Sequence, residues 1–279
     1  MASPAYAIGA ALIWAFSPIY YRGFLEKFDV VSFNLLRTAA ATAVLAVPAL
    51  YFWNTAGLGL AIVSGVITLT CGDSLFFLSI REAGASVAAP VVYVYVLMIQ
   101  IVGVALGQLV PYTNLMAAFM VLAGVYGLSR GGDGKPRGKG IALATSAAVF
   151  WTIGQELIQA STDAGGNFLA VTFARNAAAA LALGLVFLAT RRRRMWPSGL
   201  GVQSYGFILF FMLGDLVLGS VLFVYSISTV GVALTVILTS LSPLLTQVFS
   251  RALGKESPSL LDFAGGILIV GALVLAVAL

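Results

Sequence analysis

The stretch GDSLFFLSIREAGASVAAPVVYVYVLMIQIVGVALG, residues 72–107, occurs twice in this chain. Shifted by 147 positions it lies over residues 219–254, GSVLFVYSISTVGVALTVILTSLSPLLTQVFSRALG, and 11 of the 36 aligned residues are identical. A composition this rich in Ala, Leu, Gly and Val would give roughly three or four identities by chance, so the stretch is an internal repeat. The two copies predict a fold built from two related halves.

The composition of the chain places it in a lipid bilayer. With 61% hydrophobic and 9% charged residues, a chain of 279 residues is too apolar to cover a soluble globule. The net charge of +5 does not indicate nucleic acid as a partner, because the basic residues form short clusters between apolar segments, without a platform of aromatic residues. One cysteine, Cys71, and no histidine leave no internal disulfide and no thiolate–imidazole metal set, so we expect neither a metal nor a cofactor.

Ten apolar segments follow one another along the chain, each near the ~20 residues that a helix needs to cross a bilayer. Helices are expected because lipid offers no hydrogen-bond partner to an open backbone. The ten predicted spans lie at about residues 4–21, 30–52, 57–80, 84–107, 111–129, 139–160, 167–190, 204–227, 230–252 and 258–279.

The repeat extends to the early spans of each half. Residues 33–41, FNLLRTAAA, resemble residues 172–179, TFARNAAA, so that Arg37 corresponds to Arg175. Each half then holds five spans: the first half is residues 1–132 and the second half is residues 133–279. Because the number of crossings per half is odd, the second half enters the membrane from the opposite face. The predicted fold is an all-α integral membrane protein with ten transmembrane helices in two inverted five-helix repeats.

The placement of the basic residues predicts the orientation. Of the 15 Lys and Arg residues, Arg37 and Arg175 lie well inside spans, and the other 13 all fall in the odd-numbered loops or at the span ends that border them. Since basic loops stay on the cytoplasmic side, the odd loops are expected to be cytoplasmic and both termini outside. We therefore expect a multi-pass protein of the cell's inner (plasma) membrane.

The chain resembles the drug/metabolite transporter superfamily, EamA type. The resemblance rests on the five-span halves, on an arginine early in the second span of each half, and on residues 243–274, PLLTQVFSRALGKESPSLLDFAGGILIVGALV. It implies a transporter of small solutes whose central cavity is formed by spans one to four and six to nine, with spans five and ten as outer support. Members of this family usually have cytoplasmic termini, and the charge count of this chain departs from that pattern.

Three acidic residues lie deep within predicted spans. Asp215 is near the middle of its span, Asp73 is about two-thirds along, and Glu156 is near the end of span 139–160. A charged side chain at the bilayer centre is unfavourable by about 3 kcal/mol on insertion scales, which makes such residues candidate functional groups. Either they bind a cation, a proton or the substrate, or they pair with a buried arginine or hydroxyl and hold helices together. For Glu156 an interfacial position is a further alternative.

Two arginines and two glutamines occupy matched positions in the two halves. Arg37 and Arg175 lie a turn or two from opposite membrane faces, which favours a structural role, holding loop carbonyls or extending to the surface; contact with an anionic substrate is the alternative. Gln100 and Gln247 need partners within the bundle, so they contact substrate or join helices.

Aromatic residues inside the spans complete the candidate site. Trp14, Trp151, Tyr93 and Tyr225 lie within apolar segments, and Trp14 and Trp151 near an acid can form an aromatic box around an ammonium group. Ordinary packing between helices is the alternative for each of them.

These features predict a secondary transporter that works by alternating access on a small polar metabolite. Three buried acids against two peripheral arginines favour an amino acid or another zwitterionic or cationic solute, with protons as a candidate coupling ion. The alternatives are an exchanger of organic anions or sugar conjugates that uses Arg37 and Arg175, and an intramembrane enzyme. The chain has no histidine and neither HExxH nor GxSxG, so we predict no catalytic residue and no enzyme. A monomer and a homodimer both remain open.

Overall fold

The computed structural model describes residues 4–84, 88, 91–128, 138–190, 202–252 and 260–278, and these residues contain helices and no strand. The helices of the first half are α1 (Ala5–Leu25), α2 (Val30–Tyr51), α3 (Leu58–Gly65), the π-helix η1 (Val66–Gly72), α4 (Asp73–Ala83), α6 (Tyr95–Ala105) and α7 (Tyr112–Leu128). Those of the second half are α8 (Gly138–Asp163), α9 (Phe168–Ala189), α10 (Val202–Leu213), the π-helix η2 (Gly214–Gly219), α11 (Ser220–Val230), α12 (Val232–Thr239), α13 (Leu241–Ala252) and α14 (Leu260–Ala278).

All ten predicted spans contain an apolar helix in the described part of the chain. Five helical segments are long and apolar enough to cross a membrane: Val30–Tyr51, Leu58–Ala83, Gly138–Asp163, Phe168–Ala189 and Gln203–Val230. Shorter apolar helices, Ala5–Ser17, Tyr95–Ala105, Tyr112–Tyr126, Val232–Thr246 and Ala264–Val277, fall in the other five predicted spans. The all-helical membrane architecture is thus confirmed.

Two of the predicted spans are interrupted rather than continuous. The span predicted at 230–252 is divided at Ser240 into α12 and α13. Pro243 explains this break, because it has no N–H to donate to the carbonyl four residues earlier and its ring crowds that carbonyl. In the span predicted at 84–107, a turn at Tyr93 and Val94 precedes α6, which begins at Tyr95.

The backbone repeats the sequence offset of 147. Gly84 and Gly231 follow α4 and α11, and both adopt left-handed φ values, 81° and 84°. The π-helix η1, shifted by the same offset, covers residues 213–219 and coincides with η2. A π-helix holds one more residue per hydrogen-bonded turn than an α-helix and often occurs at functional sites. Each half therefore has a widened turn at the same place.

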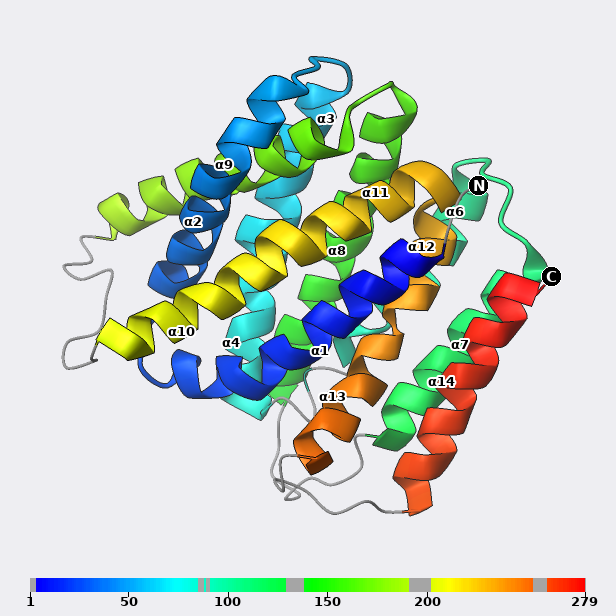
Figure 1. The fold of residues 1–279 in the computed structure, drawn as a ribbon. Coiled ribbons are helices and arrows are strands. Elements are labelled where there is room, and N and C mark those ends of the chain that lie inside the picture. The colour runs from blue at the N-terminus through cyan, green and yellow to red at the C-terminus, as the bar shows by residue number, and fades with distance from the viewer. Residues whose placement is uncertain are drawn as a thin grey trace.

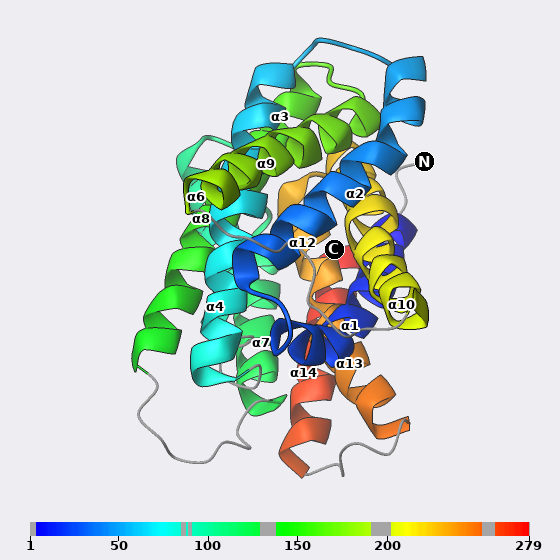
Figure 2. The same ribbon diagram turned by 90° about the vertical axis from the view of Figure 1, so that its left-hand side faces the viewer.

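The two halves run in opposite directions. In Figure 1, α7 descends from its cyan-green start to its green end, whereas α14, its counterpart in the second half, rises beside it to the red C-terminal end. This pair lies at one edge of the molecule, as the family resemblance implies for spans five and ten. Figure 2 shows that α2 and α9, the second helices of the two halves, lie side by side, and the two helices pack on each other. The boundary predicted between residues 132 and 133 lies outside the described residues.

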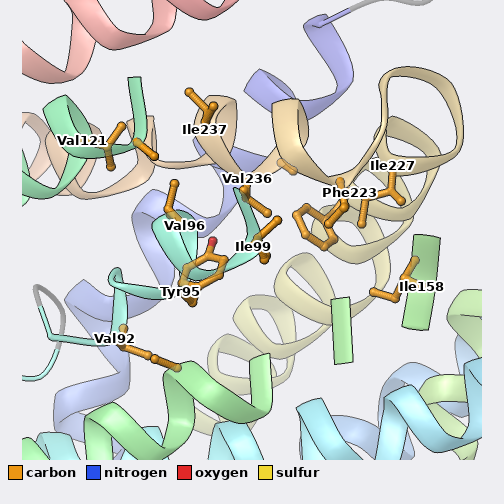
Figure 3. Packing of buried hydrophobic residues seen from close by; sticks show 14 of the residues in the cluster. Val92, Tyr95, Val96, Ile99, Val121, Ile158, Phe223, Ile227, Val236 and Ile237 are labelled. Carbon is orange, nitrogen blue, oxygen red and sulfur yellow. The ribbon is translucent and has the colours of Figure 1, made fainter. Parts of the chain in front are cut away.

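The first helix of each half packs on the opposite half. Helix α1 contacts η2 and α11, and α8 contacts α3, η1 and α4. A shared apolar core joins the halves near α6 and α12, where Tyr95, Val96 and Ile99 lie close to Val236 and Phe223 (Figure 3). Burial of these side chains away from water and lipid holds the two halves together.

Candidate functional site

A buried ion-pair cluster links the two halves. Arg37 on α2 places Nη2 2.5 Å from Oδ2 of Asp73 and Nη1 3.4 Å from Oδ2 of Asp215. Asp73 is the first residue after η1, and Asp215 lies within η2. The two widened turns thus bring an acid from each half to the same guanidinium. We call Arg37, Asp73 and Asp215 the charge cluster.

The helix that presents Arg37 begins at a well-defined cap. The Asp29 carboxylate accepts the backbone N–H of Val31 at 3.0 Å and that of Ser32 at 3.2 Å, which satisfies free donors of the first turn. Arg37 is two turns further on, at the centre of the surface that faces the other helices. Its guanidinium lies over the ring of Phe77 at 4.9 Å and over that of Tyr21 at 5.6 Å, two cation–π contacts that hold its plane.

The four carboxylate oxygens of the cluster have different surroundings. Asp73 accepts Trp151 Nε1 at 3.0 Å on Oδ1 and Arg37 on Oδ2. Asp215 accepts the Tyr21 hydroxyl at 2.5 Å on Oδ2, the same oxygen that faces Arg37. Oδ1 of Asp215 has no hydrogen-bond donor among the described residues, and it is not one of the fully buried unpartnered atoms. Asp215 Oδ1 is therefore the accessible oxygen of the cluster.

The three residues of the charge cluster together carry a net negative charge in an apolar setting. The exposed fractions of the surfaces of Arg37, Asp73 and Asp215 are 3%, 7% and 8%, respectively. Two carboxylates share one guanidinium, so the ionised cluster has a net charge of −1. Desolvation of ions is unfavourable unless each is paired, which leaves the cluster suited to a further positive charge.

The indoles of Trp14 and Trp151 seal the two widened turns. Trp151, on α8, donates to Asp73 and lies over Gly72, while Trp14, on α1, donates from Nε1 to the backbone carbonyl of Asp215 at 3.2 Å and lies over Gly219. Each indole thus reaches from one half into the π-helix of the other. The edges of the rings, rather than their faces, are turned to the acids, so the predicted aromatic box is not formed around them.

The fit of the tryptophans gives a direct test of this packing. A Cβ added at Gly72 would lie 2.5 Å from Cδ1 of Trp151, so we expect Gly72→Ala to displace the indole and destabilise the protein by about 1–3 kcal/mol. Gly184→Ala is the matched control, because a Cβ there meets nothing within 4 Å. Thermal unfolding in detergent measures both. Equal melting temperatures for the two variants would contradict the contact.

Arg175 differs from Arg37 although the two positions correspond. Each is the eighth residue of its helix, α9 and α2, and each retains 3% of its exposed surface. Arg175 Nε donates to Ser64 Oγ at 3.1 Å, and Ser64 Oγ in turn donates to the carbonyl of Gly154 at 2.6 Å. No carboxylate oxygen of the described residues lies within 4.0 Å of Arg175. The expectation that both arginines hold loop carbonyls or extend to the surface is wrong, because both point into the bundle.

Glu156 belongs to a second polar group, and none of its hydrogen bonds is to a residue of the charge cluster. Its Oε2 accepts Gln108 Nε2 at 2.7 Å, and its Oε1 is buried without a partner among the described residues. The neighbouring side chain of Gln155 also has an unpartnered buried oxygen. With 8% of its surface exposed, Glu156 is buried among the helices of the protein.

The remaining predicted residues lie outside the charge cluster. Gln100 joins helices, since its Nε2 donates to the carbonyls of Val96 and Ala233 at 3.3 and 3.0 Å. Tyr93 packs against Tyr95 with ring centroids 5.8 Å apart, and Tyr225 packs against Tyr6 and Phe168 at 4.5 and 4.8 Å. The side chain of Gln247 lies outside the described part of the chain.

Three residues of the site are not evident from the sequence alone. Tyr21 lies at the predicted end of the first span, whereas α1 continues to Leu25 and carries Tyr21 into the core. Ser64 could have been noticed, because a small polar residue beside Gly65 in an apolar span is typical of close helix contacts. Gln108 follows α6 and gives no periodic signal. Their partners belong to other helices, so their roles follow from the fold.

Comparisons with known proteins agree with this architecture. The model of the EamA-like transporter family matches residues 2–130 and 138–278, and the chain belongs to this family. Together with its apolar helices, this makes it a multi-pass membrane protein of the transporter class. An Archaeoglobus fulgidus protein described as an uncharacterized transporter is 26% identical over 163 residues, which are 56% of this chain and 58% of that protein. A crystal structure of another protein has a TM-score of 0.79 and 21% identity, covering 98% of this chain and 96% of that one, which shows the shared fold.

Proposed function

We propose that this protein is a secondary transporter that carries a small solute bearing a positive charge, either a cation or a zwitterion such as an amino acid, across the cell's inner (plasma) membrane. Inverted halves around one central site are the arrangement that allows alternating access, in which one half rocks against the other. The charge cluster, which joins α2, η2 and the start of α4, is the site where the cargo binds and from which it is exposed to one side of the membrane or the other. The odd-numbered loops face the cytoplasm.

The single observation that carries this proposal is the accessible oxygen Oδ1 of Asp215 in a cluster of net charge −1. An ammonium group or a proton on that oxygen would make the cluster neutral, which favours a buried assembly. The fork of Arg37 is occupied by two carboxylates, so an anion would have to displace one of them. The geometry therefore favours a positive group on the cargo, with protons as the coupling ion.

A ligand screen tests the class of cargo. Purified protein in detergent is heated with amino acids, primary amines or organic anions, each at two pH values. Since a ligand that prefers the folded state stabilises it, at a concentration 100-fold above its Kd by about 2.7 kcal/mol, we expect higher melting temperatures with amines or amino acids. Counterflow of the stabilising solute in proteoliposomes then measures transport itself.

The control for the screen is Glu82→Gln. Glu82 is a surface acid that pairs with Lys139 at 2.7 Å and makes no ion pair with the charge cluster. This variant should respond as the wild type does. An organic anion that stabilises the protein most would reverse the assignment and favour the exchanger of anions or sugar conjugates. Stabilisation without counterflow would argue against transport.

A further inference from the structure

The guanidinium of Arg175 is a buried cation whose outer nitrogens are unused. Ser64 Oγ binds Nε at 3.1 Å. Neither Nη1 nor Nη2 has a hydrogen-bond partner among the described residues, yet neither is one of the fully buried unpartnered atoms, so both keep accessible surface. Arg37 shows the reverse pattern, with both Nη atoms facing carboxylates and Nε buried without a partner. The two outer nitrogens of the Arg175 guanidinium, which form its fork, are thus left without a hydrogen-bond partner among the described residues.

This fork lies beside the charge cluster. Helices α2 and α9 pack on each other, and Arg37 and Arg175 occupy the same position in them. Asp73 is bonded to Arg37 and is also close enough to interact electrostatically with Arg175. Ser64 fixes Arg175 from α3, the helix that leads through η1 to Asp73. The site therefore combines a negative pole at Asp215 with a positive pole at Arg175, and both lie near Asp73 and Arg37.

We propose that Arg175 binds a carboxylate of the cargo while Asp215 binds its ammonium group, so that the preferred cargo is a zwitterion. This inference rests on the proposed transport function and narrows it. A guanidinium held at Nε offers Nη1 and Nη2 as parallel donors that match the two oxygens of a carboxylate. A cargo with both charges would satisfy the two poles and bring no net charge into the membrane interior.

Matched ligands separate the contributions of the two poles. Alanine, ethylamine and propionate form one series, and phenylalanine, phenethylamine and phenylpropionate form a second with a larger side chain. Each series contains the zwitterion, the ammonium alone and the carboxylate alone. Dissociation constants are measured by thermal shift and calorimetry on the full-length protein in detergent. For the wild type we expect at least one zwitterion to bind about 10-fold more tightly than its amine, as a charge-assisted bidentate pair allows.

Three variants locate the carboxylate contact. Arg175→Gln should bind the zwitterion no better than the amine, while its affinity for the amine changes by less than about 3-fold. Arg175→Lys keeps the charge but loses the fork, so an intermediate preference is expected. Ser64→Ala releases Nε without altering the charge and should weaken the preference by a few fold. It also keeps the test available if Arg175→Gln does not fold.

The outcomes distinguish this inference from the proposed function. Amines that bind as tightly as zwitterions to the wild type, or a zwitterion preference that survives in Arg175→Gln, would overturn the role of Arg175 and leave transport of cations intact. Propionate or phenylpropionate as the tightest ligand would contradict both. No binding by either series would exclude zwitterion recognition, whereas counterflow of another cation would still support the transporter.

Discussion

The Asp215→Asn variant is expected to fold and insert in the membrane but to lose transport coupled to a pH gradient. Asparagine keeps an oxygen for the Tyr21 hydroxyl, which lies 2.5 Å from Asp215 Oδ2, and it leaves the ion pair of Arg37 with Asp73 in place. Removal of one carboxylate also makes the charge cluster neutral, so stability should not fall. The negative charge that attracts a proton or an ammonium group is gone, and affinity for a charged partner falls about 10- to 100-fold.

Uptake of the solute identified by the ligand screen, measured in proteoliposomes with and without an imposed proton gradient, tests this expectation. The wild type should accumulate the solute when the gradient is applied, and the variant should not respond to it. The surface variant Glu82→Gln serves as the control. A variant with normal gradient-driven accumulation would remove Asp215 from the mechanism.

Arg37→Gln is expected to be the most destabilising substitution in the site. Arg37 lies between two carboxylates, at 2.5 Å from Asp73 and 3.4 Å from Asp215, and retains 3% of its exposed surface. Its loss would leave two buried negative charges without a guanidinium. Removal of one partner from a buried ion pair typically destabilises a protein by about 3–5 kcal/mol. We therefore expect a large fall in melting temperature and in the yield of folded protein.

A second substitution separates charge from packing in this result. In Arg37→Gln/Asp73→Asn the cluster again has one negative charge, so part of the lost stability should return. Arg81→Gln, at the exposed end of α4, is the control and should behave as the wild type. If the double variant is no more stable than Arg37→Gln, the loss comes from the shape of the arginine and its contacts with Tyr21 and Phe77.

The fold could be predicted from the sequence because a small number of strong constraints determine how a chain folds in a membrane. Apolar length predicts the spans, and the repeat of residues 72–107 predicts two related halves, which the matching conformations of Gly84 and Gly231 confirm. The continuity of the spans was harder to predict. The break at Ser240 follows from Pro243 and could have been read from the sequence. The π-helices could not, because one extra residue in a turn leaves no mark on apolar periodicity.

The sequence identified several residues of the candidate site, but it did not predict the contacts between them. Asp73 and Asp215 were singled out because charged groups are rare at membrane depth. Arg37 was singled out for its counterpart in the second half, and Trp151 as an aromatic residue inside a span. Their meeting at one point depends on the packing of α1 and α8 on the opposite halves, which a sequence of two similar repeats does not reveal. The interpretation of Arg37 as peripheral was wrong for the same reason. Its position early in the second span suggested the surface, whereas the packing of α2 buries it beside Asp73 and Asp215.

The packing of each first helix on the other half also bears on how the protein is made. Helix α1 leaves the ribosome early, but its partners η2 and α11 are complete only after residue 230 has been synthesised. During translation the amino-terminal half therefore waits in the bilayer with its binding surface for the later helices uncovered. We expect nascent chains that stop before α11 to be degraded by membrane proteases, and chains that extend past it to become resistant.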